Sequence, residues 1–105
     1  MSKTQIISVK IFNHKWSVRF IDPDKMREGD IGTCWSYKRA IDIDNTLTYE
    51  EAKTILLHEL THAFLASCGD LHQDQYKEEK VCDFVAWNAD EMIAVRDNVL
   101  KAVFK

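Results

Sequence analysis

Glycine and proline are scarce in this chain, which has three glycines and one proline among 105 residues. Long flexible or proline-rich linkers need many of these residues, so the composition argues against separate segments joined by linkers. A length of 105 residues is also typical of one domain. We therefore expect residues 1–105 to form a single globular domain around one modest hydrophobic core.

An excess of basic charge is also missing. The formal net charge is −3, the pI is near 5.7, and charges of both signs are mixed along the chain. This balance argues against a nucleic-acid-binding domain and gives no sign of attraction to a membrane surface. No run approaches the roughly 20 apolar residues of a membrane helix, and the N-terminus lacks the apolar core of a signal peptide. We expect a cytoplasmic protein with no nucleic-acid or membrane partner; if the gene is mobile, the cytoplasm is that of the host cell.

A disulfide framework is not indicated either. The chain has only three cysteines, Cys34, Cys68 and Cys82, at wide spacings and without a Cys-x-x-Cys pair. Disulfide-bonded domains normally use an even number of cysteines. We expect a reducing compartment and small, mostly buried thiols.

The first part of the chain has the alternation of apolar and polar residues that is typical of strands. Residues 5–21 contain two such runs separated by a short turn at 13–15, and they predict a β-hairpin. Residues 24–33 are polar, contain two of the three glycines, and predict a loop. A third strand is expected within 34–44, most clearly at 39–44. Two aspartates on one face of this segment suit an exposed or edge strand.

A helix is expected after the third strand. Thr48 and Glu51 match the capping box that marks a helix start. The helix should run from about Tyr49 to Cys68, because Gly69 provides a natural stop.

A second helix should begin near residue 75 and continue to about residue 99 or beyond. Its apolar residues have helical spacing, and it contains no glycine or proline. Three strands followed by two helices predict an α+β domain. Its sheet would be small and three-stranded, antiparallel or mixed, and the C-terminal helix would back the first one.

The first helix carries the segment His58-Glu59-Leu60-Thr61-His62. Histidines four residues apart lie on one face of a helix, so both neutral rings can bind the same Zn²⁺ ion. Glu59 is offset by about 100° around the helix, and its carboxylate would accept a proton from a metal-activated water. This arrangement is typical of zinc metallopeptidases in which the glutamate is the general base. The alternative is a chance pattern in a glutamate-rich amphipathic helix.

A catalytic zinc site needs a third protein ligand. The metzincin continuation, with a glycine and a third histidine at fixed spacing, is missing from residues 63–69. A carboxylate on the second helix is the better candidate, and Glu78, Glu79 and Asp83 are available. Glu79 and Asp83 share one helix face, so we favour Glu79 as the ligand and Asp83 as the acceptor of a ligand histidine's outer N–H. The alternative for these acids is a solvated helix face.

The chain resembles the ImmA/IrrE-type zinc peptidases, which phages and mobile elements often encode. The resemblance rests on residues 40–43, on residues 55–65 around the histidine motif, and on residues 79–86. The last segment, Glu-Lys-Val-Cys-Asp-Phe-Val-Ala, is similar to the family's Glu-x-x-Ala-Asp/Asn-x-Phe-Ala pattern. The likeness covers less than half of the chain.

This resemblance implies a minimal zincin fold of the gluzincin type. It implies His58, His62 and Glu79 as zinc ligands and Glu59 as the base. The chain departs from the family at Cys82, where alanine is usual, and it lacks the Leu-Leu-x-Pro stop that often ends the pattern. Some members cleave repressors, but that substrate cannot be transferred to this chain.

Two further segments are candidates for contact with a substrate. His72 and Tyr76, between the two helices, could donate a hydrogen bond to the oxyanion; a surface histidine and a packed tyrosine are the alternative. The strand at 39–44 could pair with an extended substrate by strand addition.

Together these features predict a zinc-dependent endopeptidase with one Zn²⁺ per chain and a protein or peptide substrate. The alternative is a catalytically silent zinc-binding module of the same fold that regulates a protein partner by binding it. In either case the metal would join the two helices, so its removal should loosen the fold.

Overall fold

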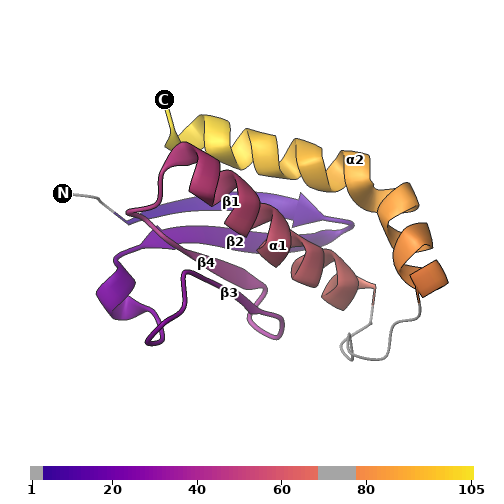
Figure 1. Cartoon of the computed structure of the whole chain (residues 1–105), viewed down its shortest axis with the longest axis horizontal. Coiled ribbons are helices and arrows are strands. Elements are labelled where there is room, and N and C mark those ends of the chain that lie inside the picture. Colours follow the sequence, from indigo (N-terminus) through magenta and orange to yellow (C-terminus); the bar gives the residue numbers. More distant parts are fainter. Residues whose placement is uncertain (1–3, 69–77) are drawn as a thin grey trace.

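A computed structural model describes residues 4–68 and 80–105 in full, together with the backbone of residues 78 and 79. The chain is an α+β structure in which two helices lie on one side of a four-stranded sheet (Figure 1). The strands are β1 (Gln5–Ile11), β2 (His14–Ile21), β3 (Gly32–Trp35) and β4 (Ala40–Asp44). A short 3₁₀ turn, η1 (Pro23–Lys25), follows β2, and the helices are α1 (Tyr49–Ser67) and α2 (Glu78–Val103). The predicted α+β class is confirmed, but the sheet has one strand more than expected.

The predicted hairpin is confirmed as the antiparallel pair β1 and β2. Ile11 pairs with His14, so the loop consists of Phe12 and Asn13 and begins one residue earlier than expected. Phe12 adopts a positive φ of 54°, which is uncommon for a bulky residue. Its ring packs edge-on against Phe64 of α1, with 5.4 Å between the ring centroids, and this contact holds the turn against the helix.

The single third strand predicted within 34–44 is wrong, because this segment contains the hairpin of β3 and β4. The chain reverses between them at Arg39, which has a φ of 53° and donates its backbone N–H to the carbonyl oxygen of Ser36 at 3.3 Å. The strand order is β1-β2-β4-β3, and β4 runs parallel to β2. The prediction of an edge strand at 39–44 is therefore also wrong, since β4 is internal and β3 forms the edge.

Acidic residues can lie on an internal strand here because they have partners. Asp42 is 7% exposed and accepts three hydrogen bonds, two from the guanidinium of Arg19, at 2.6 and 3.0 Å, and one from the indole N–H of Trp35, at 2.9 Å. Asp44 accepts from the backbone N–H and the hydroxyl of Thr46 at 2.8 and 2.6 Å. These bonds offset the cost of removing the carboxylates from water.

Helix α1 begins as the sequence predicts. The Thr48 hydroxyl accepts from the backbone N–H of Glu51 at 3.2 Å, and the Glu51 carboxylate accepts from the backbone N–H of Thr48 at 2.9 Å. This reciprocal pair satisfies two backbone donors at the start of the helix. The helix ends at Ser67, with Cys68 as its C-cap, close to the expected position.

Helix α2 spans 26 residues and packs against the core mainly through its second half, where Met92, Val99 and Leu100 are buried. Most side chains from 80 to 91 are exposed. Trp87 is 86% exposed, although the helical spacing of the apolar residues in this segment predicts a packed face. Neither helix, within the part of the chain that is described, is apolar enough over sufficient length to cross a bilayer.

The cysteines form no disulfide with one another, but they are not mostly buried, which differs from the expectation. Cys34 is half-buried, whereas Cys68 and Cys82 are exposed. Cys34 belongs to the sheet face that packs on α1, and the two exposed thiols lie at the end of α1 and in the exposed half of α2.

Gly32, at the start of β3, lets this edge strand lie directly against α1. A Cβ atom at this position would come within 2.6 Å of Ile55 Cγ2 and 3.2 Å of Glu59 Cγ. Real carbon atoms do not approach as closely as the first of these distances, so only glycine fits without a shift of strand or helix. The loop predicted for 24–33 therefore ends too late, because β3 already begins at this residue.

We expect Gly32→Ala to destabilise the chain by about 1–3 kcal/mol, the usual cost of overpacking a core contact. This cost outweighs the gain of about 0.4–1 kcal/mol that an alanine brings by restricting the unfolded chain. Urea unfolding measures the change. Ile55→Leu removes the branch that meets the new methyl group, so the double variant should recover part of the loss. Equal stability of Gly32→Ala and the parent chain would contradict the close contact.

Candidate active site

His58 and His62 lie one turn apart on α1 with their rings turned toward each other. Their Nε2 atoms are 3.3 Å apart, and the ring centroids are separated by 4.9 Å. Two nitrogen ligands at the usual zinc distances and a tetrahedral angle lie about 3.3 Å apart. The pair therefore has the spacing of two ligands of one metal ion, and the predicted shared helix face is confirmed. Without a metal, one ring can donate a hydrogen bond to the other at this distance.

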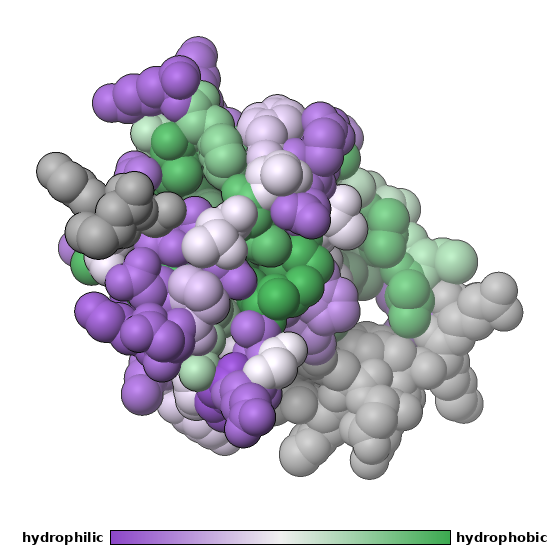
Figure 2. Space-filling model, turned by 60° about the vertical axis from the view of Figure 1, so that its left-hand side comes forward, coloured by the Kyte–Doolittle hydropathy of each residue, from purple (hydrophilic) through white to green (hydrophobic). Residues whose placement is uncertain are grey.

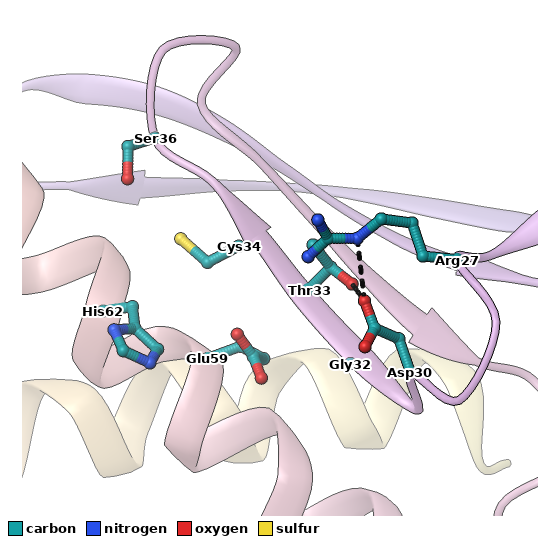
Figure 3. Close-up of a pocket in the computed structure, with 8 residues that line it drawn as sticks. All are labelled: Arg27, Asp30, Gly32, Thr33, Cys34, Ser36, Glu59 and His62. Carbon is teal, nitrogen blue, oxygen red and sulfur yellow. Dashed lines mark hydrogen bonds and ion pairs between the residues drawn. The ribbon is translucent and has the colours of Figure 1, made fainter.

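Glu59 points away from solvent, toward β3, and its side chain lies in the same pocket as His62 (Figure 3). It is only 7% exposed, and its Oε2 atom is 4.0 Å from His58 Nε2. Burial raises the pKa of the Glu59 carboxyl above its ordinary value, while the nearby His58 and His62 rings lower that pKa and Asp30 adds to the increase. The side chain is thus a partly desolvated carboxylate beside the two histidines.

The pocket in front of Glu59 has a volume of about 360 Å³, and its other wall comes from β3 and the loop before it. Asp30 in this wall accepts hydrogen bonds at 3.1 Å from the Arg27 guanidinium and from the Thr33 hydroxyl (Figure 3). The sequence does not predict this wall, because the polar residues 24–33 indicate a loop. A glycine next to a strand pattern, as at Gly32, was the available signal for a close backbone approach.

Cys34 also faces this pocket, from the middle of β3. Burial and the nearby Glu59 carboxylate raise the pKa of its thiol to about 11, while a hydrogen bond involving Ser36 opposes the increase. A thiol with this pKa is protonated at neutral pH and is a poor nucleophile. This cysteine is therefore part of the pocket wall rather than a reactive group.

The remaining predicted site residues are not brought together by the described part of the chain. His72, Tyr76 and the side chain of Glu79 lie outside the described residues, and Asp83 is exposed on α2. Among the residues that are described, no three His, Cys, Asp or Glu side chains are grouped closely enough to hold a metal ion. The described site consists of two histidines at ligand spacing and one buried carboxylate.

Comparisons with protein-family models, curated proteins and solved structures found no match for this chain. Its chemistry must therefore be inferred from the site itself. Two convergent imidazoles can bind a transition metal, and a desolvated carboxylate can exchange protons with a water molecule in the adjacent pocket. In the part of the chain that is described, β3 is the last strand of the sheet and lines the pocket that contains Glu59 and His62, so an extended ligand along this strand would meet both residues.

We expect Glu59→Gln to stabilise the metal-free chain at neutral pH. A carboxyl whose pKa is raised by folding destabilises the folded state once it is ionised, and glutamine removes that charge. The advantage should shrink as the pH falls toward the ordinary glutamate pKa of about 4.3, where the wild-type side chain also becomes neutral. Thermal unfolding in the presence of a chelator measures both effects.

The matched control for this prediction is Glu50→Gln, which changes an exposed carboxylate on the same helix. It should alter the unfolding temperature little at any pH. A Glu59→Gln variant that is less stable than the parent chain at neutral pH would show that Glu59 is not held in a desolvated environment.

Proposed function

We propose that this chain is a zinc-dependent endopeptidase with His58, His62 and Glu79 as metal ligands and Glu59 as the general base. The observation that carries the proposal is the 3.3 Å separation of the two histidine Nε2 atoms beside a buried carboxylate. The resemblance to ImmA/IrrE-type peptidases supports Glu79 as the third ligand. An edge strand alongside the motif helix suits a minimal zincin fold.

Zinc, when bound, would polarise the scissile carbonyl and lower the pKa of water. Glu59 takes a proton from the attacking water as the oxygen bonds to the carbonyl carbon. It then delivers that proton to the amine as the carbon–nitrogen bond breaks. Burial raises the pKa of Glu59, which makes its carboxylate a stronger base toward the attacking water.

The substrate would be aligned by the edge of the sheet. The sequence predicts strand addition at 39–44, but β4 is internal, whereas β3 pairs only with β4 among the residues that are described. An extended peptide can hydrogen-bond to such a free edge. Gly32 of this strand lies against Glu59, so a peptide on β3 would pass within reach of the base.

A second function is favoured by the exposed half of α2. Val81, Val85 and Trp87 are 45%, 46% and 86% exposed and lie close in sequence to Glu79. Exposed apolar side chains gathered on one helix are common at protein-binding surfaces. The alternative is therefore a catalytically silent zinc-binding module that regulates a protein partner.

We expect one Zn²⁺ per purified chain and cleavage of an unfolded protein such as casein. Glu59→Gln should retain the metal, because the ligands are untouched, and should lose activity by about 10²–10⁴-fold, the usual contribution of a general base. Metal analysis and a cleavage assay measure the two quantities. Zinc uptake with no cleavage by either form would favour the silent module, and failure to take up zinc would exclude both functions.

Glu79→Gln should weaken zinc binding by at least about 100-fold, since even partners behind the ligands contribute about 10–100-fold. Glu78→Gln is the matched control, because it makes the same change one residue earlier on α2. Competition with a chelating dye measures the affinity. At the same zinc concentration, zinc should also raise the unfolding temperature of the parent chain by more than that of Glu79→Gln. If Glu78→Gln or Asp83→Asn causes the loss instead, the ligand assignment is wrong.

A further inference from the structure

An apolar pocket of about 380 Å³ lies on α1 before the candidate active site. Its apolar lining consists of Ile31, Leu47 and Ile55, and Glu50, Glu51 and Thr54 complete it. The pocket occurs where the start of α1 meets the segment entering β3. Figure 2 turns this side of the molecule forward, and hydrophobic surface gathers there at the centre of the view, with hydrophilic residues around it.

The pocket and the histidine pair share one face of the helix. Ile55 precedes His58 by three residues and His62 by seven, which places them along one stripe of α1. One turn of helix is about 5.4 Å long, close to the distance of about 6.6 Å between side chains on the same face of an extended peptide. A peptide that binds beside the histidines would therefore place a side chain in this pocket, near the bond to be cleaved.

Gly32 lies between the apolar pocket and Glu59. Ile55 and Glu59 are both within 3.2 Å of the position that a Cβ atom of Gly32 would occupy. Ile31, the residue before it, contributes the opposite wall of the pocket. The apolar pocket and the polar pocket in front of Glu59 are thus consecutive along one edge of the sheet.

Ile31 is exposed although its backbone is fixed. Its carbonyl oxygen accepts from the backbone N–H of Asp44 at 3.0 Å, which ties the residue to the end of β4. Its side chain is nevertheless 45% exposed, whereas Leu47 and Ile55 are half-buried and rest on the core. The exposed side chain of Ile31 therefore leaves apolar surface next to Leu47 and Ile55 that a ligand can bury.

The charge at the rim favours one kind of ligand. Two acidic residues, Glu50 and Glu51, line the pocket, and its other lining residues are uncharged. An apolar side chain would gain from burial in the floor, and a basic side chain next to it would be attracted by the rim.

We propose that this pocket selects the substrate by binding an aliphatic or aromatic side chain of an extended peptide, with a lysine or arginine beside it. The link to cleavage rests on the proposed peptidase function. The binding itself requires only the pocket and therefore occurs in the metal-free chain.

The test uses methyl NMR spectra of the metal-free chain during titration with the capped dipeptide N-acetyl-Leu-Lys-amide. The methyl signals of Ile31 and Ile55 should shift, while N-acetyl-Ser-Lys-amide should cause little change and N-acetyl-Leu-Glu-amide should bind more weakly. Ile31→Ser should weaken binding about 5–10-fold, as expected for the loss of roughly 1 kcal/mol of apolar contact.

Ile6→Ser is the matched control, because Ile6 is also an exposed isoleucine, 60% exposed, but lies on β1 at the opposite edge of the sheet. It should leave binding unchanged. Thr54→Phe fills the pocket from an exposed helix position and should abolish the Ile55 shift. No shift at Ile31 or Ile55, or equal binding of the serine and leucine dipeptides, would overturn the proposal.

A peptide library digested by the zinc-loaded chain separates this proposal from the peptidase function. Cleavage sites should be enriched in an apolar residue at one position near the cut, and Ile31→Ser should reduce that preference. Glu59-dependent cleavage without any apolar preference would overturn the pocket but leave the peptidase function standing. Selective dipeptide binding without zinc uptake or cleavage would support the pocket but overturn the peptidase function.

Discussion

The close approach of β3 to α1 at Gly32 is the constraint on which the site depends. Because residue 32 has no side chain, the edge strand lies against Ile55 and Glu59. This contact buries the Glu59 carboxylate and places the polar pocket on one side and the apolar pocket on the other. A strand held one side chain further away would leave Glu59 in water and merge the two pockets into an open surface.

Burial gives His58 and Glu59 different properties although they are neighbours on one helix. His58 is exposed and Glu59 is buried, so a ligand reaches the histidine from solvent, whereas the carboxylate meets only what enters the pocket. Desolvation raises the pKa of Glu59, which costs stability in the absence of a compensating charge. Stability sacrificed at one position is typical of functional sites. A purely structural glutamate on this helix would be expected to point to solvent.

Local patterns predicted the parts of the fold that depend on neighbouring residues. The capping pair Thr48 and Glu51 and the shared face of the two histidines follow from spacings of three or four residues, and the end of α1 follows from the glycine that comes next in the sequence. The sheet topology depended on information that no local pattern contains. The turn at Arg39 adopts a positive φ without glycine or asparagine. Asp42 can lie on an internal strand because Arg19 and Trp35 donate hydrogen bonds to it, and these partners are 23 and 7 residues away in the sequence. The pocket wall at Asp30 was missed for the same reason, since it exists only once β3 has docked on α1.

The two helices contribute unequally to the proposed metal site, and this inequality has a consequence for function. Helix α1 is anchored to the sheet by buried residues on either side of the histidines, such as Leu56 and Ala63, so the two imidazoles are set by the core. The proposed third ligand precedes residues 80–91 of α2, whose side chains are largely exposed, so zinc binding would add a restraint between this half of α2 and α1. Metal binding and the position of this half-helix are then coupled, because each contributes to the free energy of the other. A partner protein that binds Val81 and Val85, which share one helix face, would act on the same equilibrium, so catalysis and regulation by binding are compatible outcomes of one arrangement.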